Sequence, residues 1–152
     1  MSPSIIIRVS ISKQLLYVQD EETGEVLLTA PISTAKAGTG YEDGSGCTPT
    51  GTFVVCSKHG ENAPLNTVFS SRIPVGVWPE AGGEDAIVSR ILRLDGLEEC
   101  NANTRARYIY IHGTPDIEHL GAPVSHGCIR LSPEDAAIVH SHATIGTKVF
   151  IA

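Results

Sequence analysis

The chain of 152 residues is long enough for one domain, and we expect residues 1–152 to fold as a single unit around one core. Its apolar content of 41% is ordinary for a globular protein and excludes an intrinsically disordered one. The net charge of −6, with basic residues scattered along the chain, makes nucleic acid and anionic membranes poor partners.

The N-terminal segment and the cysteines both bear on the cellular compartment. The apolar stretch at residues 5–7 is far too short for the core of a secretory signal, and no basic segment precedes it. The spacing of the cysteines matches neither a disulfide framework nor a zinc-binding pattern, so we expect reduced thiols and no bound metal. These features predict a cytoplasmic protein. The cysteines are Cys47, Cys56, Cys100 and Cys128.

The first third of the chain is typical of an antiparallel meander. Residues 5–11, 14–18 and 26–32 are rich in β-branched and other apolar residues, and short turns separate them. The turn before the third strand contains Gly24, which suits a positive φ. Residues 33–51 then form a long, glycine-rich loop, and such a loop in a compact domain is usually functional or mobile.

The middle of the chain gives weaker signals. Residues 53–57 are strand-like, residues 58–72 are expected to be irregular, and residues 73–78 form a short extended run. Residues 86–94 fit either a helix or a twisted strand, and their β-branched content favours the strand.

Near the C-terminus, residues 132–146 carry the signals of a helix. Ser132 is a good N-cap, Pro133 suits the first helical position, and acidic residues follow where the helix dipole favours them. A closing strand is expected at residues 148–151. The predicted protein is mainly β, with one or two short helices.

The strongest chemical signal lies in residues 108–131. A strand-like run ends at His112, and His126 and Gly127 directly precede Cys128. A cysteine nucleophile needs a base, because a free thiol is mostly protonated near neutral pH. We predict His112 as this base, since the loop after it is long enough to fold its ring over the thiol. We predict His126 as a substrate-binding group.

Two further features of this stretch bear on catalysis. Gly127 lets a substrate carbonyl approach the backbone, and the amides of Gly127 and Cys128 are predicted to form an oxyanion hole, worth roughly 3–4 kcal/mol per donor. A cysteine alone is more often a small apolar core residue. The combination with two nearby histidines and the glycine favours catalysis.

These motifs resemble the catalytic domain of the L,D-transpeptidases, the YkuD type. The resemblance rests on His112-Gly113-Thr114 followed by Ser125-His126-Gly127-Cys128-Ile129-Arg130, and on Thr48-Pro49-Thr50-Gly51-Thr52-Phe53 before a strand. The interval from His112 to Ser125 is a few residues shorter than is typical of the family. The resemblance implies a mixed β-sandwich of the L,D-transpeptidase catalytic type.

The family resemblance also implies roles for individual residues. Cys128 forms a thioester with the donor, His112 transfers protons, and the backbone carbonyl of Gly113 orients His112. Ser125 and Arg130 support the loop or bind substrate, with Arg130 suited to a carboxylate by its bidentate fork. No cofactor is implied, and the oligomeric state is left open.

The implied partner is a peptidoglycan stem peptide or a muropeptide. With water as acyl acceptor the protein is an L,D-carboxypeptidase that trims tetrapeptides, and with an amine it is an L,D-transpeptidase that crosslinks the wall. The expected cytoplasmic location favours the carboxypeptidase of peptidoglycan recycling. The alternatives are an exported L,D-transpeptidase whose leader is not part of this sequence, and a non-catalytic binding module. An activated Cys128 is expected to react with iodoacetamide well below pH 8 and far faster than the other cysteines.

Overall fold

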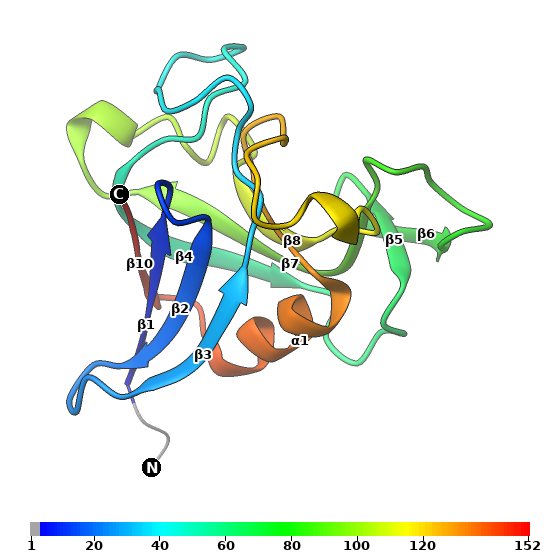
Figure 1. The fold of residues 1–152 in the computed structure, drawn as a ribbon, viewed down its shortest axis with the longest axis horizontal. Helices are drawn as coiled ribbons and strands as arrows, with labels where there is room; N and C mark the ends of the chain where they lie inside the picture. Colours follow the sequence, from blue (N-terminus) through cyan, green and yellow to red (C-terminus); the bar gives the residue numbers. More distant parts are fainter. Residues whose placement is uncertain (1–3) are drawn as a thin grey trace.

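The computed structural model describes residues 4–152 and is dominated by strands (Figure 1). One α-helix and two short 3₁₀-helices accompany them within these residues. The elements are β1 Ile5–Ser10, β2 Leu15–Asp20, β3 Val26–Pro31, β4 Gly51–His59, β5 Thr67–Ser70, β6 Ile73–Val77, β7 Ile87–Gly96, η1 Glu99–Asn101, β8 Tyr110–Gly113, η2 Ile117–His119, β9 Ile129–Leu131, α1 Pro133–His142 and β10 Lys148–Ile151.

The strands form one mixed, open sheet. Its order is β3-β2-β1-β10-β4-β7-β5-β6, and β8 pairs with both β7 and β9. The parallel pairs are β1 with β10 and β8 with β9. The predicted meander of β1, β2 and β3 is confirmed, as is the mainly β class of the fold.

The two halves of the sheet face each other across the larger of two buried apolar clusters. Ile7 and Leu16 from the meander are fully buried in the same cluster as Leu94 of β7 and Ile129 of β9. Helix α1 closes this core against β7 and β8, and contributes Val139 to it (Figure 1). The opposite face of β7, β8 and β9 therefore points away from this core.

The helix begins where its local signals predict. The hydroxyl of Ser132 accepts a hydrogen bond of 3.0 Å from the amide of Asp135, and Pro133 occupies the first turn. Residues 87–96 form the strand β7, in agreement with the favoured alternative. No helix among the described residues combines the length and the apolar character needed to cross a membrane.

The prediction of irregular structure at residues 58–72 is wrong in part, because β5 lies within it. Strand β5 has four residues, and it is completed by pairing with β6 and with β7. Short strands of this kind gain their hydrogen bonds from partners that no local pattern identifies. The hairpin β5–β6 extends away from the meander (Figure 1).

Buried His140 is expected to make the protein sensitive to acid. Burial, followed by the charges of Lys58, Arg90 and His59, lowers the pKa of His140 to about 4. Its Nε2 also has no hydrogen-bond partner among the described residues. Because its pKa is lower in the folded than in the unfolded chain, the unfolded chain binds the proton first. Stability is therefore lost as the pH falls from about 6.5 towards 4.

We therefore expect His140→Leu to raise the free energy of unfolding at about pH 5 by about 2 kcal/mol more than at about pH 8. Urea denaturation of both proteins at the two pH values measures this difference. His142→Leu on the same helix is the control. An equal effect of His140→Leu at both pH values would contradict the prediction.

Candidate active site

The site is built on the parallel pair β8–β9. His112 lies directly beside Arg130 in this register, and Ile111 lies beside Ile129. Side chains alternate between the faces of a strand, so His112 and Arg130 project to the face opposite the core residue Ile111. Cys128 immediately precedes β9 and faces the same way. The register thus places His112 and Cys128 on one face as diagonal neighbours.

The Cys128 sulfur is held by the backbone of two tyrosines. The amide of Tyr110 donates to Sγ at 3.3 Å, and the thiol donates to the carbonyl of Tyr108 at 3.5 Å. These are the hydrogen bonds of the sulfur in the described structure, so the thiol proton points to Tyr108 and not to His112. A rotation of the thiol must therefore precede any proton transfer to His112.

The ring of His112 is fixed by its neighbour. Its Nδ1–H donates to the carbonyl of Gly113 at 2.7 Å, and the side chain is almost fully buried. This hydrogen bond is the one that the family resemblance implies. It assigns the proton to Nδ1 and leaves Nε2 as a free acceptor. The backbone carbonyl of Gly113 thus sets the protonation of both ring nitrogens, with the proton on Nδ1 and a free lone pair on Nε2.

The resting charges of the pair follow from burial. Burial raises the pKa of the Cys128 thiol, against the opposing effects of the Tyr110 amide and of Arg130 and Arg107. Burial, opposed by the Gly113 hydrogen bond and assisted by the charge of Arg130, lowers the pKa of His112 to about 4. Near neutral pH the free protein therefore holds a neutral thiol and a neutral imidazole. Because loss of solvation outweighs the nearby cations, the raised pKa of the thiol acts against the predicted fast reaction of Cys128 with iodoacetamide well below pH 8.

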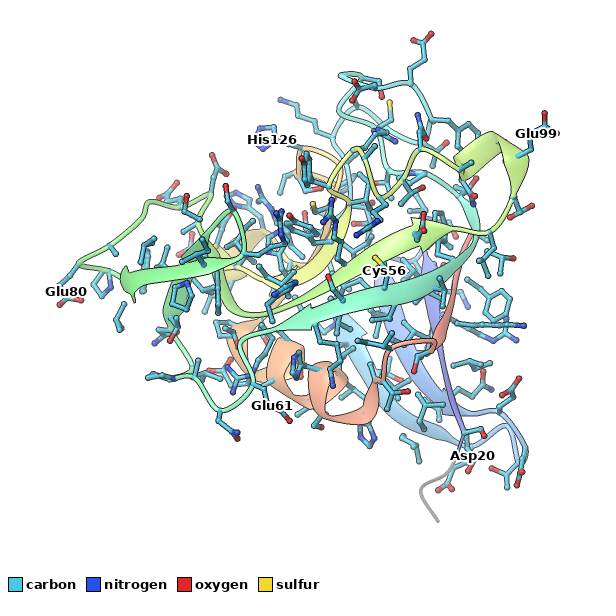
Figure 2. All side chains as sticks on the ribbon, turned by 180° about the vertical axis from the view of Figure 1, so that it is seen from behind. Asp20, Cys56, Glu61, Glu80, Glu99 and His126 are labelled. Atoms are coloured by element: carbon cyan, nitrogen blue, oxygen red, sulfur yellow. The ribbon has the colours of Figure 1, made fainter. Side chains whose placement is uncertain are left out.

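A pocket of about 350 Å³ opens at the thiol. His126 lies on its rim and is exposed on an outward-facing turn, as Figure 2 shows. Its predicted role in binding substrate remains a prediction. The lining residues are Asp43, Gly44, Gly46, Arg107, Tyr108, Ile109, His126 and Cys128. A larger hollow of about 770 Å³ lies elsewhere, between β1 and the end of α1.

Ser125 is a support of the loop, which corrects its prediction as a substrate-binding residue. It is only 2% exposed. Its hydroxyl donates to the carbonyl of Cys128 at 2.7 Å, and its backbone pairs with Thr34 and Lys36. A hydroxyl that is buried and engaged in this way is not available to a ligand.

Arg130 is likewise engaged within the protein. Its guanidinium lies 3.1 Å from a carboxylate oxygen of Asp85 and 3.9 Å from one of Asp116, and the residue is 5% exposed. The prediction that it binds a substrate carboxylate is corrected for this reason. Its charge acts instead on the two reactive groups, favouring a thiolate at Cys128 and a neutral ring at His112.

The two predicted oxyanion donors differ in availability. The amide of Gly127 donates to the hydroxyl of Ser125 at 3.3 Å, so it is already paired. The amide of Cys128 has no acceptor among the hydrogen bonds of residues 4–152. We retain Cys128 as the predicted donor, and Gly127 can join only by leaving Ser125. Gly127 itself has a φ of +130°, which favours glycine.

The long loop before β4 supports the nucleophile from the other side. The hydroxyl of Thr48, which is fully buried, donates to the carbonyl of Gly127 at 2.9 Å and accepts from the amide of Ala35. The Thr48-Pro49-Thr50 motif is therefore structural at its first position. The guanidinium of Arg107 holds the same loop in place by donating a hydrogen bond of 2.7 Å to the carbonyl of Cys47.

Several residues of the site have no signal in the sequence. Tyr108 and Tyr110 act through backbone atoms, which any residue type provides. Arg72 reaches the site from the hairpin β5–β6, where its guanidinium donates to the hydroxyl of Tyr110 at 2.7 Å. The described residues contain no group of three or more histidines, cysteines and acids arranged to hold a metal ion.

Gly113 is required by close packing, and Gly113→Ala is expected to disturb both stability and the site. A Cβ at this position would lie 2.5 Å from the carbonyl oxygen of Val88 and 3.0 Å from the Cβ of Ser89. We expect a loss of about 1–3 kcal/mol in the free energy of unfolding, because such overpacking displaces backbone. The carbonyl that holds His112 moves with it.

Urea denaturation and thiol-dependent turnover measure the two effects of Gly113→Ala. Gly83→Ala is the matched control, since a Cβ at Gly83 meets no atom within 4 Å. Equal stability of the two variants would contradict the packing argument.

Comparisons with known proteins agree with the fold and with the motifs. The solved structures similar to this chain include an L,D-transpeptidase from Mycobacterium smegmatis, with 22% identity and a TM-score of 0.65 over 99% of this chain and 59% of that one. An LD transpeptidase in complex with imipenem has 28% identity and a TM-score of 0.63, with the same coverage. An L,D-transpeptidase from Xylanimonas cellulosilytica has 22% identity and a TM-score of 0.63, over 100% of this chain and 62% of that one.

The chain thus spans about 60% of the length of these solved structures. A search of curated proteins gave no match. The family model of the L,D-transpeptidase catalytic domain, YkuD, matches residues 4–151. The chain therefore belongs to the L,D-transpeptidase catalytic domain family.

Proposed function

We propose that this protein is a cysteine-dependent L,D-carboxypeptidase, which removes the terminal D-alanine from peptidoglycan tetrapeptides through a thioester. The observation that carries the proposal is the common face of Cys128 and His112 on β8–β9, with a pocket that opens at Cys128. The pocket volume of about 350 Å³ lies within the range for ligand sites, so the pocket can take part of a donor peptide.

The acylation step uses the neutral pair. The Cys128 thiol turns from Tyr108 to His112 and transfers its proton to Nε2 as sulfur attacks the carbonyl of the third residue. The Cys128 amide binds the oxyanion that forms. Arg130 favours the developing thiolate at this point. The imidazolium of His112 is held by the Gly113 carbonyl.

Collapse of the intermediate completes acylation. The C–N bond to D-alanine breaks, and His112 gives its proton to the leaving amine. A water molecule then attacks the thioester, and His112 takes a proton from it and returns this proton to sulfur as the C–S bond breaks. The products are the tripeptide and D-alanine, and the enzyme returns to the neutral thiol and imidazole.

The second candidate function is L,D-transpeptidation, which forms peptidoglycan crosslinks. It is favoured by the family match and by the solved relatives, which are described as L,D-transpeptidases. The chemistry up to the thioester is the same, and an amine then replaces water. The setting that we propose for hydrolysis is the cytoplasm, where soluble muropeptides are recycled, in keeping with four free thiols.

Mass spectrometry of the reaction products tests this proposal. The protein is incubated with L-Ala-γ-D-Glu-meso-diaminopimelate-D-Ala, with and without excess D-methionine. We expect mostly tripeptide in both reactions. Mostly D-methionine-exchanged tetrapeptide would establish the transpeptidase instead. No turnover by the wild type would refute both candidate functions for this donor.

We also propose that Cys128 is acylated by β-lactams of the penem and carbapenem classes. One solved relative is described as a complex with imipenem and another as carrying a faropenem-derived adduct. Intact-protein mass spectrometry after incubation with faropenem gives a readout of the thiol that does not depend on the peptide donor.

A further inference from the structure

A pair of arginines without carboxylate partners lies against the ring of Tyr108, whose backbone carbonyl accepts a hydrogen bond from the Cys128 thiol. The ion pairs among the described residues involve only Arg130 and His119 as cations. Arg72 and Arg93 are half-buried, and their guanidinium groups stack on the ring of Tyr108 at 5.4 Å and 4.8 Å from its centroid. Unpaired arginines at one place in a protein of net charge −6 indicate a site for an anion.

Arg72 is tied to the Cys128 sulfur by two tyrosines. The backbones of Tyr108 and Tyr110 bind the sulfur, and the side chains of the same two residues bind Arg72. Tyr110 thus links the two groups. Its hydroxyl accepts from Arg72 at 2.7 Å, and its backbone amide donates to the Cys128 sulfur at 3.3 Å.

The hydroxyl of Tyr110 adds a second donor at this place. It accepts the hydrogen bond from Arg72, so its own proton remains free to donate. No other hydrogen bond competes for this proton, since Arg72 is the only partner of the hydroxyl among residues 4–152. A guanidinium and a hydroxyl side by side are complementary to the two oxygens of a carboxylate.

The supporting charge comes from Arg93. One of its nitrogens donates to the carbonyl of Arg105 at 2.9 Å, and its buried Nε–H has no acceptor among the described residues. Burial lowers the pKa of His59, next along this face of the sheet, and the charges of Arg72 and Arg93 act in the same direction. In Figure 2, nitrogen-bearing side chains gather between the hairpin β5–β6 and the turn that carries His126.

We propose that Arg72 and the Tyr110 hydroxyl bind the terminal carboxylate of the donor peptide, with Arg93 as the second positive charge. The inference rests on the proposed function. In a tetrapeptide this carboxylate lies one residue, about 4 Å along the chain, beyond the carbonyl that the sulfur attacks. The contact makes a free C-terminal D-residue a requirement of the enzyme, so that longer or amidated donors are poor substrates.

Two donors that differ only at the C-terminus test the proposal. They are the tetrapeptide acid and the same tetrapeptide ending in D-alaninamide, and kcat/KM is measured for both. We expect the wild type to prefer the acid by roughly 10- to 100-fold, as is typical of hydrogen bonds to a charged group. Arg72→Met should lose most of this preference by lowering kcat/KM for the acid while leaving the amide nearly unchanged.

Three variants sharpen the result. Arg72→Lys keeps the charge without the fork and should restore part of the preference. Tyr110→Phe removes the hydroxyl and should reduce the preference less than Arg72→Met does. Arg8→Met is the matched control, because Arg8 also stacks on a ring, that of Phe150 at 5.3 Å, but lies on β1. It should retain the full preference.

The outcomes separate this inference from the proposed function. If Arg72→Met lowers kcat/KM equally for both donors, or changes neither, the carboxylate assignment is wrong while the hydrolase stands. If the wild type hydrolyses neither donor, calorimetric binding of both peptides to Cys128→Ala decides the matter. Tighter binding of the acid that Arg72→Met abolishes would uphold the assignment without the function, and equal binding would overturn it.

Discussion

Cys128→Ala is expected to abolish both hydrolysis of the tetrapeptide and the acyl adduct with faropenem. Ser125 cannot replace the sulfur as a nucleophile, because its hydroxyl is buried and hydrogen-bonded within the loop. Removing a nucleophile from a triad-type site reduces kcat by on the order of 10⁴- to 10⁶-fold. The fold should survive, since Cys128 is not part of the main core cluster.

Intact-protein mass and tetrapeptide turnover measure the effect of Cys128→Ala. Cys56→Ala and Cys100→Ala are the controls, and both should keep the adduct and the activity. These two thiols are free but lie outside the pocket. Persistence of an acyl adduct in Cys128→Ala, or its loss in either control, would show that another residue carries the acyl group.

The catalytic motifs could be predicted from the sequence because each is local. Gly113 follows His112 directly, and the hydrogen bond that fixes the ring joins these two residues. Ser132 and Pro133 likewise define the start of α1 within one helical turn. Where a role depends only on neighbours in the chain, residue type and spacing are enough.

The roles of Arg130 and Arg72 depend on partners that are distant in the sequence. The same guanidinium chemistry suits a substrate or a structural ion pair, and only the fold brings Asp85 and Asp116 to Arg130. Arg72 lies 38 residues from Tyr110 along the chain and reaches it through the hairpin β5–β6. Residue type and spacing alone could therefore not decide between the two roles expected for Arg130, and they gave no signal for Arg72.

The charge state of the site is also a property of the fold. The two histidines near Cys128 in the sequence predict an activated thiol, and Arg130 and Arg107 do favour its thiolate form. Burial on the face of β8–β9 reverses the balance for Cys128 and lowers the pKa of His112. Burial cannot be judged from the two motifs alone, and it makes proton transfer part of the attack.

Substitution of His112 is the decisive test of that proton transfer. We expect His112→Gln to lower kcat by about 10²- to 10⁴-fold near neutral pH, the contribution of a positioned general base. The thiol of Cys128 then has no acceptor for its proton, and the burial that raises its pKa keeps the thiolate scarce. Activity of the variant should recover as the pH rises and hydroxide ionises the thiol. His126→Gln, on the rim, is the control and should affect KM more than kcat.

The wild type should show a different pH profile from this variant. His112 acts as a base only when neutral, and burial lowers its pKa to about 4. The value of kcat/KM for the free enzyme should therefore stay level as the pH falls through 6.5 and decline only near pH 4. Circular dichroism at each pH separates this limb from acid unfolding. An acid limb near pH 6.5 in the folded protein would contradict the lowered pKa of His112. A wild-type profile in His112→Gln would show that His112 is not the base, because the variant has no imidazole at this position to accept the thiol proton.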